Sequence, residues 1–286
     1  MPMMNINGAR LNVESRGTGT ALVLIHPPFI ASGIFHDWVN RLSGQYRVIT
    51  FDLRGHGKSE RSNIPLSYPL LVEDLLAVMD ACGVQKAFVG GYSTGAQIAL
   101  EALLTVQDRF LGGILVSGMS ELSDFRVKPL IHLSVWASEM KAKELLAFTI
   151  AWGNSSREQT FRELRKEGLD GDTSNWAQYS RYSLYYNCTA QLNRIRVPML
   201  LLYGEIDKKF RSYAAIMFRG LPNAELYWVK GAKHQLPTKF ADESTRILLQ
   251  WLDKHSHREP GNDLREAGRV AAEGSMEAHQ FPPGHM

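Results

Sequence analysis

The chain has 286 residues, of which 44% are hydrophobic and 21% charged, with a formal net charge of +3 at pH 7. This composition excludes a fully disordered, a collagen-like or a coiled-coil chain and supplies enough apolar material for a sizeable core. Acidic and basic residues are interspersed, so no basic face indicates a nucleic-acid partner. The two cysteines cannot form a disulfide framework and lack metal-ligand spacing, so we expect no metal site.

We expect neither a targeting segment nor a membrane segment in this sequence. Its first residues have no charged segment followed by an apolar run, so they do not resemble a signal peptide. No stretch approaches the roughly 18 uninterrupted apolar residues of a transmembrane helix. We therefore expect a cytoplasmic protein with a small-molecule substrate, no nucleic-acid partner and no membrane association. The sequence does not indicate the oligomeric state.

The predicted elements begin with a hairpin near the amino terminus. The pair Asn7-Gly8 stands between two short runs, at 5–6 and 9–11. An Asn-Gly pair between such runs is the strongest short-range signal for a β-hairpin. We expect an antiparallel hairpin that leads into a parallel sheet.

Six short apolar runs follow, and helical patterns separate most of them. Near-continuous apolar runs are typical of parallel strands covered on both faces, and their alternation with helices predicts an α/β fold. The pattern at 68–81, for example, places Leu71, Leu75 and Val78 on one helix face. The expected strands are 21–25, 48–51, 87–90, 114–117, 199–203 and 224–229, and further helices are expected at 96–104 and 243–252.

The alternation stops between 122 and 193 and resumes afterwards. Helical stretches rich in aromatic residues, such as 133–152 and 156–167, replace it. We interpret 122–193 as a helical cap inserted into one core made of 1–121 and 194–255, with an independent helical domain as the alternative. The remaining segment, 256–286, is rich in Gly, Pro, Glu and Arg, and we expect it to be disordered.

The sharpest chemical signal is Gly91-Tyr92-Ser93-Thr94-Gly95, between a predicted strand and a predicted helix. A nucleophile on a tight strand-to-helix turn needs small neighbours on both sides. The turn would present the Ser93 hydroxyl at a helix amino terminus, where free N–H groups favour developing negative charge. A structural glycine turn is the alternative.

A serine nucleophile needs a base, and the base needs an acid that orients it. Asp207 follows the strand at 199–203, and His234 follows the strand at 224–229. The carboxyl ends of parallel strands meet in one crevice, and the chain order Ser, acid, His is typical of one architecture. We therefore expect Ser93, Asp207 and His234 to form a catalytic triad.

Four other residues remain candidates for the acid or the base. Glu205 lies two residues from Asp207, and Asp124 follows the strand at 114–117. His56 lies in a glycine-rich turn and His26 ends the first buried strand. Both histidines precede the nucleophile, and we expect them to bind nearby backbone and hold their loops.

Taken together, these features resemble the α/β-hydrolase superfamily over residues 5–255. The resemblance implies a mostly parallel eight-stranded sheet with an N-terminal hairpin and a helical cap over the active site. It also implies Ser93 as nucleophile, Asp207 as acid and His234 as base. The segments that carry it are the hairpin, Leu24-Ile25-His26, the run from Asp52 to Ser59 (Asp-x-Arg-Gly-His-Gly-x-Ser), the turn 91–95, 197–207 and 231–234.

One loop departs from the family's pattern. The family usually follows the strand's His with Gly, and a later N–H in that loop helps to form the oxyanion hole. Here the run is His26-Pro27-Pro28-Phe29, and proline has no N–H to donate. The expected donors are therefore Thr94 and Phe29, the nearest residue able to supply one. Loss of one oxyanion donor lowers the rate by about 10²–10³. Either the Phe29 N–H is rotated into the oxyanion hole, or the protein has poor activity.

The predicted activity is that of a serine hydrolase without a cofactor. An aromatic cap offers contact area to an apolar or aromatic group, so we expect a small carboxylic ester as substrate; packing of the cap is the alternative role of these aromatics. Lactone, thioester, amide or carbon–carbon bond hydrolysis would use the same machinery. A small-molecule receptor with slow turnover is a further alternative, which the double proline favours.

Overall fold

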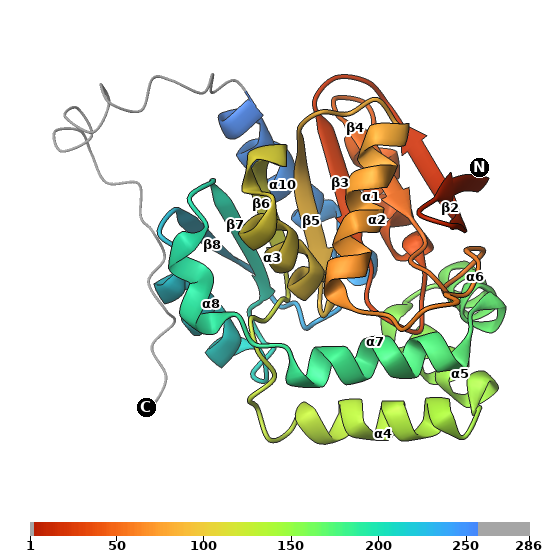
Figure 1. Ribbon diagram of the computed structural model, residues 1–286. Helices are drawn as coiled ribbons and strands as arrows, with labels where there is room; N and C mark the ends of the chain where they lie inside the picture. Colours follow the sequence, from red (N-terminus) through yellow and green to blue (C-terminus); the bar gives the residue numbers. More distant parts are fainter. Residues whose placement is uncertain (1–2, 257–286) are drawn as a thin grey trace, which may run out of the picture.

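The computed structural model describes residues 3–256, and its centre is one eight-stranded sheet (Figure 1). The strand order is β1-β2-β4-β3-β5-β6-β7-β8. β2 runs antiparallel to β1 and to β4, and all later neighbours are parallel. The predicted mostly parallel α/β sheet with an N-terminal hairpin is confirmed. The strands are β1 (Met3–Ile6), β2 (Ala9–Arg16), β3 (Ala21–Ile25), β4 (Arg47–Phe51), β5 (Ala87–Tyr92), β6 (Phe110–Val116), β7 (Met199–Gly204) and β8 (Ala224–Val229).

Helices cover both faces of this sheet and one of its ends. In the part of the chain that the structure describes, no helix is long and apolar enough to cross a bilayer. The helices are α1 (His36–Leu42), α2 (Tyr68–Ala81), α3 (Gly95–Thr105), α4 (Lys128–Glu139), α5 (Lys143–Asn154), α6 (Glu158–Asp170), α7 (Thr173–Tyr185), α8 (Arg211–Gly220), α9 (Leu236–Lys239) and α10 (Ala241–Ser256), with 3₁₀ turns at Ser32–Phe35, Gln107–Arg109 and Thr189–Arg194.

The N-terminal hairpin turns at the predicted Asn-Gly pair. Ile6 pairs with Ala9, so only Asn7 and Gly8 lie in the loop. Both have positive φ, 45° and 77°. This is the backbone that a two-residue hairpin turn needs to match the strand twist, and Asn and Gly are the residues that adopt it most easily.

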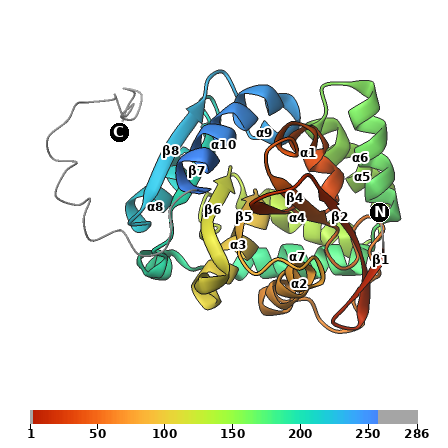
Figure 2. The ribbon, with the colours of Figure 1, turned by 90° about the horizontal axis from the view of Figure 1, so that it is seen from above.

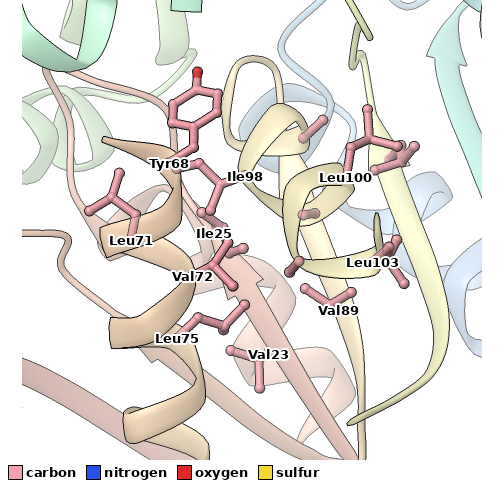
Figure 3. Packing of buried hydrophobic residues seen from close by; sticks show 14 of the residues in the cluster. Val23, Ile25, Tyr68, Leu71, Val72, Leu75, Val89, Ile98, Leu100 and Leu103 are labelled. Carbon is pink, nitrogen blue, oxygen red and sulfur yellow. The ribbon is translucent and has the colours of Figure 1, made fainter. Parts of the chain in front are cut away.

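The apolar strands bury both of their faces, as their sequences predict. Successive side chains point to opposite faces of a strand, so in β3 Leu22 and Leu24 pack in the cluster that includes α1 and α10. Val23 and Ile25 face the other way, toward α2 and α3 (Figure 3). The view from above shows these two pairs of helices on opposite sides of the sheet (Figure 2). This double cover explains the continuous apolar runs.

β8 differs from the expectation of a strand buried on both faces. Among the described residues its only neighbouring strand is β7, so it forms an edge of the sheet. Most of its side chains are half-buried, and Tyr227 is 38% exposed. The apolar residues of β8 are only partly covered at the edge of the sheet. An apolar sequence pattern does not distinguish such a strand from a fully buried one.

Helices α4 to α7 lie between β6 and β7 in the sequence and together at one end of the sheet (Figure 1). The single helical stretch expected at 133–152 is wrong: α4 ends at Glu139 and α5 begins at Lys143. Lys141, between them, has a left-handed backbone with φ of 56°. The cap boundaries at 122 and 193 stay a prediction. Of the predicted disordered tail, 256–286, only Ser256 lies within the described residues, where it ends α10.

The aromatic residues of these helices divide into two groups. Trp176 and Tyr179 on α7 are buried. Trp136 on α4 and Trp152 on α5 are exposed, at 58% and 68%. Burial in the core therefore accounts for Trp176 and Tyr179 but not for Trp136 and Trp152.

Candidate active site

Ser93 lies on a tight turn between β5 and α3. Its backbone is left-handed, with φ of 55°, and its N–H donates to the Val116 carbonyl at 2.8 Å. A Cβ on Gly91 would lie 2.4 Å from the Gly95 carbonyl oxygen, and one on Gly95 would lie 2.4 Å from the Ile25 carbonyl oxygen. Backbone atoms approach both glycines so closely that a side chain would not fit at either position. The serine between them has a strained backbone.

The structure brings the three expected catalytic side chains together. Ser93 Oγ lies 3.0 Å from His234 Nε2, and His234 Nδ1 lies 3.3 Å from Asp207 Oδ2. The second contact is within ion-pair distance, but the N–H is not well enough aligned on the oxygen to form a hydrogen bond. Contacts of this kind are commonly long or misaligned before a substrate binds. The carboxyl ends of β5, β7 and β8 supply the three groups.

Further residues, to which the sequence assigns no role, hold the His234 ring. The rings of Phe210 and Tyr92 flank it, with centroids 4.2 Å and 5.4 Å away. Ser117 Oγ donates to the His234 carbonyl at 3.2 Å. Phe210 and Tyr92 each lie within three residues of a predicted catalytic residue, which is the only sequence signal that could have found them.

The alternative acids are engaged by other partners. Glu205 Oε2 accepts the Gly231 N–H at 2.9 Å. Asp124 forms an ion pair with Arg126 at 2.6 Å. Among the three candidate carboxylates, only Asp207 lies within ion-pair distance of His234.

The alternative bases, His26 and His56, hold loops, as expected. His26 Nε2 accepts the Leu53 N–H at 2.9 Å, and its Nδ1 donates to the Pro27 carbonyl at 2.8 Å. His56 Nδ1 donates to the Arg54 carbonyl at 2.9 Å. Both rings are fully buried, and burial lowers the pKa of both, that of His56 to about 3. Both imidazoles are therefore neutral near neutral pH and fix the loops after β3 and β4.

The buried His56 predicts a pH dependence of stability. Below its ordinary pKa of 6.5 the unfolded chain binds a proton that the folded chain does not bind until about pH 3. The free energy of unfolding should therefore fall as the pH drops from about 6.5 toward 3. Urea unfolding of His56→Gln between about pH 7 and pH 4 should show a shallower slope than the wild type. The exposed His36, changed to Gln, is the matched control and should keep the wild-type slope; equal slopes for both variants would contradict the assignment.

The loop after β4 is fixed by buried charges. The Arg54 guanidinium pairs with Asp74 at 2.6 Å, with side-chain exposures of 3% and 1%, and it also donates to the Asn7 carbonyl. Asp52 accepts from the Ser32 N–H and hydroxyl at 2.9 Å and 2.5 Å. These bonds satisfy the buried charges and explain the polar residues of the motif that begins at Asp52.

The two expected oxyanion donors lie at the cavity with free amides. Phe29 and Thr94 both line the cavity, and in the described part of the chain neither backbone N–H donates to another group. Phe29 has a left-handed backbone with φ of 74°. Its ring packs edge-on against Trp176 at 5.6 Å, which fixes this rotated conformation directly after the two prolines.

A cavity of about 630 Å³ lies over Ser93, a size typical of small-molecule sites. One wall comes from α4 and α5, including Leu130, Ile131 and Ile150. The loops after β7 and β8 also line the cavity, including Ile206, Phe210 and Gln235. Tyr92 donates to Asn154 Oδ1 at 3.2 Å, which links the turn that carries Ser93 to α5.

Comparisons with known proteins agree with the fold described above. The family model of the alpha/beta hydrolase fold matches residues 21–236. An esterase from Exiguobacterium antarcticum (TM-score 0.78, 19% identity) covers 87% of this chain and 97% of its own. An enol-lactonase from Burkholderia xenovorans LB400 (TM-score 0.77, 20% identity) covers 88% and 100%. The magnesium-chelatase 30 kDa subunit of Rhodobacter capsulatus is 28% identical over 254 residues, 82% of this chain and 87% of that protein. The family match spans most of the chain, and the chain therefore belongs to the alpha/beta hydrolase fold family.

Proposed function

We propose that this protein is a serine hydrolase that cleaves carboxylic esters. The observation that carries the proposal is the 3.0 Å contact between Ser93 Oγ and His234 Nε2 beneath a cavity sized for a small molecule. A serine next to an imidazole is the arrangement that converts a weak hydroxyl nucleophile into an effective one.

In the proposed first step, Ser93 Oγ attacks the ester carbonyl and His234 Nε2 takes its proton. Asp207 fixes the imidazole tautomer and stabilises the imidazolium that forms. The carbonyl oxygen becomes an oxyanion, which the N–H groups of Thr94 and Phe29 stabilise. His234 then gives its proton to the departing alcohol oxygen, and the acyl group stays on Ser93.

In the second step, a water molecule replaces the alcohol. His234 takes a proton from this water as its oxygen attacks the acyl carbon, and the same two N–H groups stabilise the second oxyanion. The bond to Ser93 Oγ breaks, Ser93 regains its proton from His234, and the acid leaves. No cofactor takes part in either step.

The walls of the cavity support an ester with an apolar or aromatic part. Leu130, Ile131 and Ile150 present aliphatic surface from the α4 and α5 wall. This surface favours burial of an apolar part of the substrate. The double proline favoured a receptor with slow turnover because Pro27 and Pro28 have no N–H to donate. The free N–H of Phe29, the next residue, can serve as the oxyanion donor and weakens that argument.

Steady-state hydrolysis of p-nitrophenyl esters with rising acyl length tests the proposal. We expect multiple turnovers and an optimum at a short or medium acyl chain, beyond which the cavity is filled. Release of no more than one p-nitrophenol per protein molecule across the whole series would overturn the ester hydrolase and favour the receptor.

A further inference from the structure

Three lysines stand at the mouth of the cavity. Lys208, Lys209 and Lys233 line it and are exposed to solvent. Lys208 directly follows Asp207, and Lys233 directly precedes His234. The loops that supply the acid and the base therefore also supply this group of positive charges, which we call the lysine mouth.

No carboxylate within residues 3–256 forms an ion pair with any of these lysines. The carboxylates of neighbouring loops have other partners: Asp207 is with His234, Glu205 with the Gly231 N–H, and Asp124 with Arg126. The lysine mouth consequently carries positive charge that the described protein does not neutralise.

Another part of the cavity lining is apolar. It includes Val127, Leu130, Ile131 and Ile150. A cleft with charges of one sign and low-dielectric walls focuses its field on an incoming ligand and raises the local concentration of the opposite charge. The cavity lining therefore offers a bound substrate both aliphatic carbon and ammonium groups.

The chemistry of the site places the leaving group on the lysine side. His234 must protonate the departing oxygen, so the alcohol part lies near this ring. The loops that supply Asp207 and His234 carry the three lysines, which line the same cavity. We propose that the alcohol part of the substrate carries an anionic group, such as a carboxylate, that lies in the lysine mouth. This inference rests on the proposed function and specifies its substrate class.

A pair of esters that differ only in charge tests the inference. One is 4-butanoyloxybenzoate, whose leaving group carries a carboxylate, and the other is its neutral methyl ester. With each rate corrected for hydroxide-catalysed hydrolysis of the same ester, we expect kcat/KM to favour the anion about tenfold, because each exposed charge contact contributes little. The preference should largely disappear at about 1 M salt, where the Debye length is about 3 Å.

Substitution of the lysines tests whether the lysine mouth causes the preference for the anionic ester. The triple variant K208Q/K209Q/K233Q should bring the ratio of the two kcat/KM values to about one, since it removes the attraction. Lys230→Gln is the matched control, because Lys230 is exposed on the same loop but does not line the cavity. It should keep the wild-type ratio.

The outcomes separate this inference from the proposed function. A wild-type ratio of one, or a triple variant that keeps the preference, overturns the anionic leaving group while hydrolysis that depends on Ser93 still supports the ester hydrolase. A preference found only when the carboxylate is on the acyl side, as in p-nitrophenyl hydrogen adipate against p-nitrophenyl hexanoate, also overturns it. Absence of hydrolysis of both charged and neutral esters removes both proposals.

Discussion

Replacing Ser93 by alanine is expected to lower kcat for a p-nitrophenyl ester by about 10⁶. The alanine removes the oxygen that lies 3.0 Å from His234 Nε2, so the proposed acyl-enzyme cannot form. The amides of Phe29 and Thr94 remain and can still stabilise an oxyanion, so a small residual rate over water is expected. Steady-state kinetics with an enzyme concentration high enough to detect this residual rate is the measurement.

Two controls make the Ser93 result specific. The exposed Ser156, changed to alanine, should retain wild-type kcat. Thermal unfolding should show that Ser93→Ala folds, since alanine fits the space of serine. A fluorophosphonate probe should add its mass to the peptide that contains Ser93 in the wild type and leave the variant unmodified. Turnover that survives in Ser93→Ala would refute the assigned nucleophile.

Asp207→Asn is expected to lower kcat by about 10⁴ with little change in fold, because an amide stabilises the wrong tautomer of the imidazole. Asp207 Oδ2 lies 3.3 Å from His234 Nδ1, and in the proposed mechanism its negative charge stabilises the imidazolium. The loss should fall on kcat more than on KM, since the interaction strengthens as charge develops.

Glu205→Gln is the matched comparison for Asp207. Both carboxylates lie in the loop after β7, but Glu205 accepts the Gly231 N–H and has no contact with His234. We expect its substitution to reduce kcat by less than about tenfold, through a small displacement of the loop that carries His234. A larger loss for Glu205→Gln than for Asp207→Asn would reverse the assignment of the acid.

Local signals account for most of what the sequence predicts. The Asn7-Gly8 turn and the Gly91–Gly95 turn depend on backbone conformations that few residues adopt, so residue type alone identifies them. Once the parallel strands are recognised, the convergence of their carboxyl ends brings Asp207 and His234 toward Ser93 without any knowledge of contacts.

The features that the sequence did not predict depend on the arrangement of distant segments. The exposure of β8 depends on its position at the edge of the sheet, and the break between α4 and α5 occurs at Lys141, which has no residue-type signal for a left-handed backbone. The lysine mouth combines Lys208 with Lys233 across two loops. When charged residues are interspersed along a sequence, their spacing does not indicate which of them line the same cavity.

The left-handed backbone of Ser93 and Phe29 has a consequence for how such a protein can evolve. A side chain in this conformation costs about 1–2 kcal/mol, and glycine would relieve that cost at either position. At position 93 the relief would also remove the proposed nucleophile. Selection for thermal tolerance alone would therefore favour loss of the reaction, and persistence of serine at this position in a lineage would itself indicate that the chemistry is under selection.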